Sequence, residues 1–407
     1  MTEAPLKKPS GSFWTENIPV DWTEPNLRYV ASIRNGTDYK EFEVEDGGYP
    51  VIGSGGVFAR TSKYLHDGES VLLGRKGTVD RPLYVDGRFW TVDTMFYTHI
   101  GPRVLAKFLH YFATTIPFDY FQTSTAVPSM TQGDLGSIKV PLPTLERQRQ
   151  IVEFLDRETG QIDELIGKQE RLIELLGEKR QAIITHAVTK GLDPAAPTKA
   201  SGVPWLGDIP WNWNTDKCSR LFRAQKGSNA AELTKETCAA IPGPFPVYSG
   251  QTANAGIMAR IDKYEFDAGS DGVIFSTTVG ARAMTAAHIF GKFSLSQNCM
   301  IIRRLVPLHT RFFYYQFHVL FRFERGMIPE HMQPSFRMED LYAYSLATPP
   351  ENEQCQISDY LDDVTMKLDG LASKVNSAVG LLKERRSALI SAAVTGKIDV
   401  REGAAQL

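Results

Sequence analysis

A short basic segment enclosed by glycines has the residue types best suited to contact nucleic acid. It covers residues 74–81 and reads Gly-Arg-Lys-Gly-Thr-Val-Asp-Arg. The glycines would allow close backbone approach, and the cationic and hydroxyl side chains can donate hydrogen bonds to phosphates and base edges. A basic turn on an ordinary protein surface would have the same composition. We predict DNA contacts for Arg75, Lys76, Thr78 and Arg81.

A segment in the second half of the chain is its counterpart but has different chemistry. Residues 276–282 read Ser-Thr-Thr-Val-Gly-Ala-Arg, so hydroxyl groups replace the basic pair. Phosphate contacts position a protein on DNA while base contacts specify the sequence, and different side chains therefore suit a different half-site. We predict contacts for Thr277, Thr278 and Arg282.

Several polar residues lie in predicted turns or just ahead of predicted helices. For these residues a binding role and a purely structural role are equally open. Gln297, for example, has an amide that could bond adenine in a bidentate manner, or it could cap a strand. The candidates of this kind are Ser54, Gly55, Ser129, Thr131, Tyr248, Ser249, Gln297, Ser335 and Arg337.

The sequence lacks motifs that would indicate catalysis by the chain itself. No phosphate-binding G-x-x-x-x-G-K-[ST] is present, and Pro349-Pro350 lacks the flanking residues of an adenine methyltransferase. Asp67-Gly-Glu69 ahead of Lys76 is the nearest approach to a nuclease site, and a solvated turn explains it better. The 8 histidines form no i, i+4 pair and the 4 cysteines no C-x-x-C. We therefore predict no catalytic residue, no metal site and no disulfide framework.

The candidate residues lie in the two halves of an internal repeat. A shift of 206 positions aligns two stretches without a gap, 127–135 on 333–341 and 148–189 on 354–395. A Trp-x-x-x-Ile-Pro-x-x-Trp motif, which we call the Trp motif, opens each half, at 14–22 and at 205–213. Between these anchors the halves diverge. The order variable, shared, variable, shared predicts one scaffold that presents two different surfaces.

The shared parts are predicted to be long helices that pair with each other. Their apolar residues recur at alternating spacings of three and four, which is typical of a coiled coil. Internal pseudo-twofold symmetry favours antiparallel pairing. Thirty-odd residues of helix would span about 48 Å at ~1.5 Å per residue, enough to hold two domains about one DNA turn apart, roughly 34–36 Å. The predicted seam of the first helix consists of Ile151, Leu155, Ile162, Leu165, Leu172, Leu176, Ile183 and Ala187.

The variable parts are predicted to be mixed domains with many turns. Apolar runs predict strands at 70–74, 90–100, 272–276 and 298–305, and aromatic stretches predict helices at 104–112 and 310–323. The fold class is therefore α/β (α+β), with two such domains in tandem separated by two long helices that form an antiparallel coiled coil.

Composition sets the limits of this interpretation. The chain has 407 residues, of which 42% are hydrophobic and 23% charged, as in a soluble globular protein of several units. A formal charge of −2 argues against wholesale wrapping of nucleic acid but permits a local basic groove. Residues 196–348 carry a net +4 and residues 1–140 a net −2, so the second domain should contribute more to salt-dependent affinity. Without a long apolar run or a signal segment, we expect a cytoplasmic protein.

These motifs together resemble the specificity subunit of type I restriction-modification systems. The resemblance covers nearly the whole chain. One departure is Cys355, at a position that is usually polar, and another is the first Trp motif, which lacks the usual Gly-Asp. The segments that carry the resemblance are Pro141–Ile151 with its repeat at Pro349–Gln354, the two Ala-Val-Thr endings, the motif at Trp205–Trp213, and Val71–Gly77.

The resemblance implies a domain plan and a set of partners. Target-recognition domains at 1–143 and 192–348 would each read half of a bipartite DNA target. Helical regions at 144–191 and 349–407 would set the spacer and dock methyltransferase subunits, two in number, through which endonuclease/translocase subunits join. S-adenosylmethionine, ATP and Mg²⁺ would bind these partners, and this chain would hold no cofactor. The side chains predicted for docking are Leu165, Leu172, Leu176, Leu371 and Leu382.

Two other classes of function stay open at this stage. One is an endonuclease that acts alone, which predicts metal-dependent cleavage by the purified chain. The other is a coiled-coil scaffold without DNA binding. A DNA-binding assay with and without a methyltransferase partner would separate the three.

Overall fold

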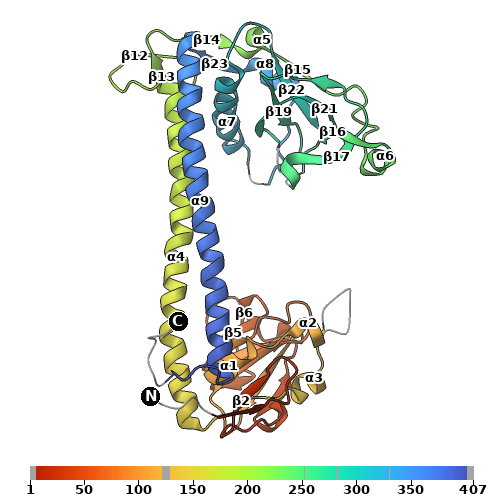
Figure 1. Ribbon diagram of the computed structural model, residues 1–407, viewed down its shortest axis with the longest axis vertical. Coiled ribbons are helices and arrows are strands. Elements are labelled where there is room, and N and C mark those ends of the chain that lie inside the picture. The colour runs from red at the N-terminus through yellow and green to blue at the C-terminus, as the bar shows by residue number, and fades with distance from the viewer. Residues whose placement is uncertain (1–5, 122–128, 252, 281–282, 330, 401–407) are drawn as a thin grey trace. The chain divides into compact units, whose positions relative to one another are not determined.

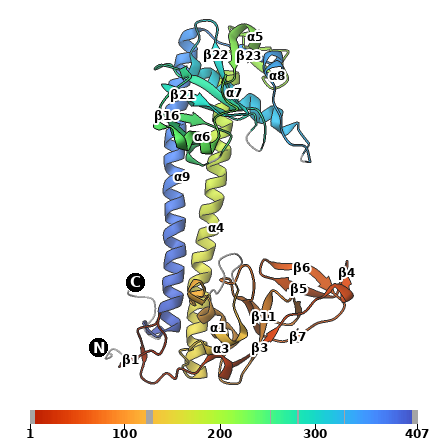
Figure 2. The same cartoon turned by 90° about the vertical axis from the view of Figure 1, so that its right-hand side faces the viewer.

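The computed structural model describes residues 6–121, 129–251, 253–280, 283–329 and 331–400 (Figures 1 and 2). Its contacts define two compact units. The first unit comprises residues 1–170 and 376–407, and the second comprises residues 171–375. Among the described residues, none of the helices combines the length and apolar character needed to cross a bilayer.

The first unit consists of small strands and short helices followed by one end of each long helix. Its helices are α1 (Ala106–Ala113), α2 (Phe118–Phe121), α3 (Gln132–Ser137), the first part of α4 (Leu145–Lys190) and the last part of α9 (Glu351–Val394). Its strands are β1 (Lys7–Pro9), β2 (Asn17–Pro19), β3 (Ala31–Asn35), β4 (Glu43–Val44), β5 (Tyr49–Gly53), β6 (Gly56–Thr61), β7 (His66–Asp67), β8 (Ser70–Gly74), β9 (Leu83–Val85), β10 (Arg88–Thr91) and β11 (Met95–Ile100).

Two sheets form most of the first variable domain. One has the order β4-β6-β5-β10-β7, in which β5 and β10 are parallel, and the other is antiparallel with the order β3-β11-β8-β9. Strand β8 is buried throughout because its side chains alternate between two cores. Val71 and Leu73 pack in the core that includes Phe108 of α1, whereas Leu72 packs with Phe89.

The second unit repeats this plan. Its helices are α5 (Cys218–Leu221), α6 (Lys235–Ala240), α7 (Thr310–Gly326), α8 (Met338–Ala343), the rest of α4 and the rest of α9. Its strands are β12 (Thr198–Ala200), β13 (Asp208–Pro210), β14 (Asn214–Lys217), β15 (Phe222–Gln225), β16 (Pro242–Tyr248), β17 (Ile257–Ile261), β18 (Phe266–Asp267), β19 (Val273–Thr277), β20 (Ala286–Ile289), β21 (Lys292–Leu295), β22 (Cys299–Arg304) and β23 (Ser345–Thr348).

The sheets of the second unit confirm the internal repeat. The order β15-β22-β19-β20 matches β3-β11-β8-β9, and β17-β16-β21-β18 matches β6-β5-β10-β7, again with one parallel pair. Strand β19 also alternates between two cores, since Ile274 packs with Phe312 of α7 while Phe275 packs with Phe293. The two variable domains therefore share one topology although their sequences differ.

Helices α4 and α9 pair antiparallel, as predicted. In the first unit the guanidinium of Arg386 lies 2.8 Å from the Asp163 carboxylate, and the Lys383 ammonium lies 3.1 Å from Glu170. In the second unit Arg180 pairs with Asp369 at 3.0 Å. As the residue number increases along α4, the residue number of its partner on α9 decreases, so the two helices run antiparallel. Apolar side chains from both helices share each unit's main core, as Ile166 and Val379 do in the first.

The predicted seam of α4 is wrong in detail. Leu165 and Leu172 are 42% and 37% exposed, while Ile166 and Ile184 are buried. The seam differs from the prediction only in part, because five of the predicted positions are buried: Ile151, Leu155, Ile162, Leu176 and Ala187. The helix is also longer than the thirty-odd residues expected, at 46 residues.

The ends of the long helices are covered by the Trp motifs. Helix α4 stops before Gly191 (φ +76°), and a Cβ there would lie 3.4 Å from the Trp213 ring. The end of α9 at Gly396 (φ +70°) is covered by Pro19, which would lie 2.5 Å from such a Cβ. In each case the positive φ and the close ring favour glycine at the end of the helix.

One predicted strand is two strands. The apolar run at 90–100 divides into β10 and β11, which belong to different sheets. Residues 92–94 form the turn between them. Both flanking segments are apolar enough to read as a single buried strand, and the break depends on tertiary pairing.

Candidate nucleic-acid interface

Three segments that are distant in sequence meet at the end of β8 in the first unit. The backbone N–H groups of Arg75 and Lys76 donate to the Thr94 carbonyl oxygen, at 2.8 and 3.2 Å, in the turn between β10 and β11. Lys76 also forms an isolated antiparallel bridge with Ser129, and the Met130 N–H donates to the Arg75 carbonyl at 3.0 Å. The loop after β8, the β10–β11 turn and the segment before α3 therefore form one cluster.

The same cluster recurs at the end of β19 in the second unit. The Thr278 N–H donates to the Asn298 carbonyl at 2.8 Å, in the turn between β21 and β22. Val279 bridges to Ser335, and the Phe336 N–H donates to the Thr278 carbonyl at 2.7 Å. The backbone of each domain thus builds the same cluster of three segments, which we call the platform. Only the side chains on the two platforms differ.

The basic loop of the first unit presents most of the side chains predicted for it. Lys76, Thr78 and Arg81 are exposed. Arg75 is half-buried, because its guanidinium donates to the Asp93 carbonyl at 3.2 Å and lies 5.9 Å from the Phe96 ring centroid. Glycine at position 74 has a structural role, because a Cβ there would lie 2.5 Å from the Cα of Val79. The close backbone approach that Gly74 permits is therefore an approach within the loop itself.

The structure corrects three predictions in the second unit. Thr277, Thr278 and Ser249 are buried, so their hydroxyl groups are not accessible to a duplex in this conformation. Thr277 ends the central strand β19, and Thr278 is covered by its backbone pairing to the β21–β22 turn. The accessible candidates of this unit are Gln297, Ser335 and Arg337, which are exposed, and Arg282 lies outside the described residues.

The segments before α3 and α8 bond to the first turns of those helices. The Thr131 hydroxyl accepts from the Asp134 N–H at 3.1 Å and donates to the Asp134 carboxylate at 2.6 Å, which caps α3. The structural role left open for Thr131 therefore holds, and capping occupies its hydroxyl. Arg337 stands at the equivalent place before α8, where its backbone N–H donates to Asp340 at 2.8 Å. Its side chain is exposed.

Loops between paired strands contain further candidates. Ser54 and Gly55 form the tip between β5 and β6, with Ser54 half-buried and Gly55 exposed. In the second unit, a Cβ on Gly250 would lie 3.8 Å from the Thr277 methyl group, which places the β16–β17 loop beside the platform. Tyr248 is half-buried against Phe275 and Phe293, and burial raises the pKa of its phenol. It supports the loop as a neutral side chain.

Across the part of the chain that the structure describes, no cluster of three or more His, Cys, Asp or Glu side chains is arranged to hold a metal ion. Cys218, Cys238 and Cys299 are buried, and Cys355 is half-buried. Burial raises the pKa of Cys218 to about 12, which makes it a poor nucleophile.

The sequence prediction missed the residues that fix each recognition domain to its helix. Gln148 of α4 and Gln354 of α9 are buried polar side chains that bond to the start of α1 and α7. Asp156 and Asp362 bond to side chains in the first two turns of those helices. The available signal was their recurrence at the 206-residue shift, because a repeat that keeps buried polar residues keeps their partners as well.

Comparison with known proteins assigns these features to one family. The model of the type I restriction modification DNA specificity domain matches residues 19–175 and 212–379. The chain belongs to this family. Each match spans one recognition domain and most of the helix that follows, so the family unit coincides with the internal repeat of this specificity-domain protein.

Individual relatives agree with this assignment. The EcoDI type I restriction enzyme specificity subunit of Escherichia coli is 21% identical over 407 aligned positions, which cover 94% of this specificity-domain protein and 89% of the relative. A chain from a structure on complex assembly and conformational transition of the type I restriction-modification system has a TM-score of 0.70 at 16% identity, covering 94% and 99% of the two chains. The HsdS subunit from Thermoanaerobacter tengcongensis has a TM-score of 0.50 at 16% identity, covering 96% and 100%. At such identities the structural likeness concerns the fold.

Proposed function

We propose that this chain is the DNA sequence-specificity subunit of a type I restriction-modification complex and performs no catalysis itself. The observation that carries the proposal is the pair of platforms, which share one backbone plan and display different side chains. Such a plan suits a protein that reads two different half-sites with one scaffold. Membership of the specificity-domain family supports DNA as the ligand.

The exposed side chains give each platform its own chemistry. Lys76 and Arg81 place positive charge at the first platform, where they neutralise phosphates, and Thr78 lies between them with a hydroxyl that can donate or accept. At the second platform Gln297 offers an amide, which fits the edge of adenine in the major groove, and Arg337 offers a guanidinium. Each domain reads one half of a bipartite target.

Partner subunits supply the chemistry in this proposal. Leu165, Leu172 and Leu371 are exposed on the long helices, and they are the apolar positions that methyltransferase subunits cover. Leu176 is buried and Leu382 half-buried against the core, so these two predicted docking residues stabilise the chain's own packing. S-adenosylmethionine, ATP and Mg²⁺ bind to the methyltransferase and endonuclease subunits, and this chain holds none of them.

The experiment that tests the proposal uses the chain reconstituted with its methyltransferase subunits. Methylated adenines mapped on random DNA should define a bipartite site. Lys76→Ala with Arg81→Ala should weaken DNA binding and lower the slope of log K against log salt by about 1 for each phosphate that the variant no longer neutralises. Lys168→Ala, which removes an exposed charge from α4, is the matched control and should leave binding and slope unchanged. Equal effects in both variants contradict the assignment of the platform.

The other two classes of function give different results in the same preparation. Cleavage of DNA by the purified chain with Mg²⁺ would indicate an endonuclease that acts alone. Absence of DNA binding both with and without methyltransferase subunits would indicate a scaffold.

A further inference from the structure

Each recognition domain is attached to its long helix at two points along that helix. The first point in the first unit is the buried amide of Gln148. Its Oε1 accepts from the Leu105 N–H at 2.8 Å, and its Nε2 donates to the Arg103 and Pro143 carbonyls, both at 2.9 Å. Leu105 is the N-cap residue of α1, so a side chain of α4 fixes the start of the domain's helix.

The second point in the first unit is the carboxylate of Asp156. It accepts from the Lys107 ammonium at 2.7 Å and from the Tyr111 hydroxyl at 2.8 Å. Thr159 lies 3.4 Å from the same hydroxyl. Burial raises the pKa of Tyr111 to about 12, so its phenol remains a donor at physiological pH. Both domain residues belong to α1, and Asp156 and Thr159 belong to α4.

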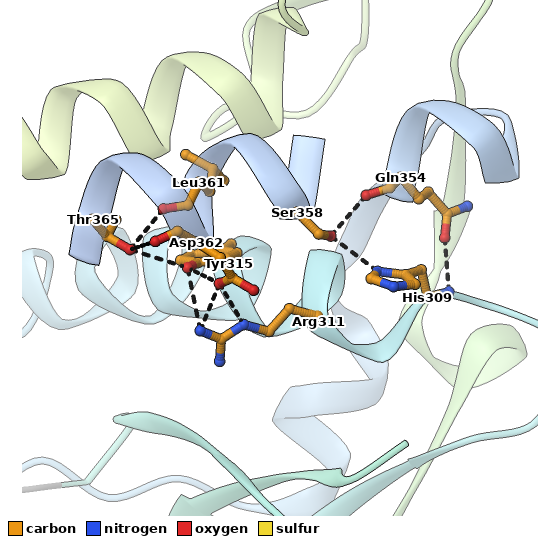
Figure 3. A network of polar contacts seen from close by, with 8 residues as sticks. All are labelled: His309, Arg311, Tyr315, Gln354, Ser358, Leu361, Asp362 and Thr365. Atoms are coloured by element: carbon orange, nitrogen blue, oxygen red, sulfur yellow. Dashed lines mark hydrogen bonds and ion pairs between the residues drawn. The ribbon is translucent and has the colours of Figure 1, made fainter. Parts of the chain in front are cut away.

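The second unit builds the same attachment, with an arginine in place of the lysine (Figure 3). Gln354 accepts from the His309 N–H at 3.0 Å and donates to the Pro349 carbonyl at 2.9 Å. Asp362 accepts from the Tyr315 hydroxyl and from the Arg311 guanidinium at 2.8 Å. His309 lies at the N-cap of α7 and also bonds the Ser358 hydroxyl at 2.9 Å. The first unit has the apolar Leu105 and Val152 in the places of His309 and Ser358.

The distance between the two points gives the attachment its mechanical effect. Gln148 and Asp156 are eight residues apart, as are Gln354 and Asp362, which is about 12 Å along a helix at ~1.5 Å per residue. One point would let a domain pivot about its helix. Two points, each with directed hydrogen bonds to one domain helix, fix the direction in which the domain is held.

We propose that these two-point junctions are the positioning device that restricts the complex to a single spacer between the half-sites. This inference rests on the proposed function. If each domain is held in one direction on its own helix, the two platforms accept only DNA with one separation between half-sites.

If a junction loosens, the domain samples several directions, and DNA with neighbouring spacer lengths becomes a substrate.

The test uses the complete methyltransferase complex and a DNA library in which the two half-sites stay constant and the spacer varies by single base pairs. Methylation is measured for every spacer. Wild type should prefer one length strongly. Asp362→Ala should reduce the preference over the adjacent lengths at least fivefold, with both half-site sequences unchanged, and Asp156→Ala should do the same. A purely structural loss would instead lower methylation at all spacers in proportion.

Two further variants keep the result decisive. Tyr315→Phe removes only the hydroxyl donor and keeps the ring in the core, so it tests the junction if Asp362→Ala does not fold; it should broaden the spacer profile to a smaller extent. Asp363→Ala is the matched control, because Asp363 pairs with Lys367 on the same helix and not with the domain. A wild-type spacer profile in folded Asp362→Ala, or in Tyr315→Phe where Asp362→Ala does not fold, overturns the inference. A wild-type complex that methylates no bipartite site overturns the proposed function itself.

Discussion

At the scale of single residues, the buried amides of Gln148 and Gln354 stabilise the structure, and their recurrence in the repeat also marks their position in the sequence. Gln148 of α4 is fully buried. Its cost of desolvation is offset only because backbone groups at the start of α1 and before α4 bond to it. Removing the amide leaves those backbone groups without a partner, which costs more than the loss of an exposed glutamine.

Substitution of Gln148 by alanine should therefore lower the free energy of unfolding by about 1–3 kcal/mol. The matched control is Gln161→Ala, at an exposed position of the same helix, which should change stability by about 0.5 kcal/mol or less. Chemical denaturation followed by circular dichroism measures both. Equal effects would show that the Gln148 bonds contribute nothing.

The half-buried histidines make stability depend on pH. Burial lowers the pKa of His110, His288 and His318 below the ordinary value of 6.5. Below that value the unfolded chain takes up protons that the folded chain does not, so stability must fall as the pH drops from 6.5. His110→Gln with His318→Gln should flatten this slope. Denaturation midpoints from pH 8 to pH 5 provide the measurement. A wild-type slope in the double variant contradicts the assignment, while any difference at pH 8 reports packing alone.

At the scale of elements, the sequence predicts those helices and strands that a local pattern of residues determines. Strands β8 and β19, helix α7 and the pair of long helices follow from apolar runs and from the repeat. The break between β10 and β11 does not, because residues 92–94 contain neither glycine nor proline. That turn is defined by the N–H groups of Arg75 and Lys76, which come from another part of the chain.

The exposure of the candidate site residues could likewise be predicted only in part. Lys76, Thr78 and Arg81 are exposed, as expected for a basic loop. The burial of Thr277 and Thr278 depends on the neighbours of β19, and threonine suits either face of a strand, so composition alone cannot place it. The choice between Leu165 and Ile166 for the seam is similar, since both are apolar and the partner helix decides.

That choice leads to a prediction for the helix pair. Ile166→Ala removes a buried side chain and should lower the free energy of unfolding by about 2 kcal/mol or more. Leu165→Ala, one residue away and 42% exposed, should change it little. Under the proposed function, Leu165→Ala should instead weaken association with methyltransferase subunits, measured by titration calorimetry. If Leu165→Ala destabilises the chain as much as Ile166→Ala, the corrected seam is wrong.

At the scale of the whole molecule, the two long helices belong to both units. Helix α4 begins in the first unit and ends in the second, and α9 does the reverse. Each unit therefore contains one recognition domain, the first part of the helix that follows it and the last part of the other helix. Under the proposed function, the half-sites depend on the platforms alone, whereas the spacer depends on the junctions and on the helices.

Lengthening both helices should therefore change the spacer and nothing else. The insertion points are Glu174, six residues before Arg180 on α4, and Val375, six residues after its partner Asp369 on α9. Four residues inserted in each add about one turn and ~6 Å, which corresponds to roughly two base pairs at ~3.4 Å each. The reconstituted complex should methylate DNA with a longer spacer and keep both half-sites. Because the platforms lie far along the chain from the insertions, altered half-sites would show that the recognition domains and the helices do not act separately, and an unchanged spacer would show that the helices do not set it.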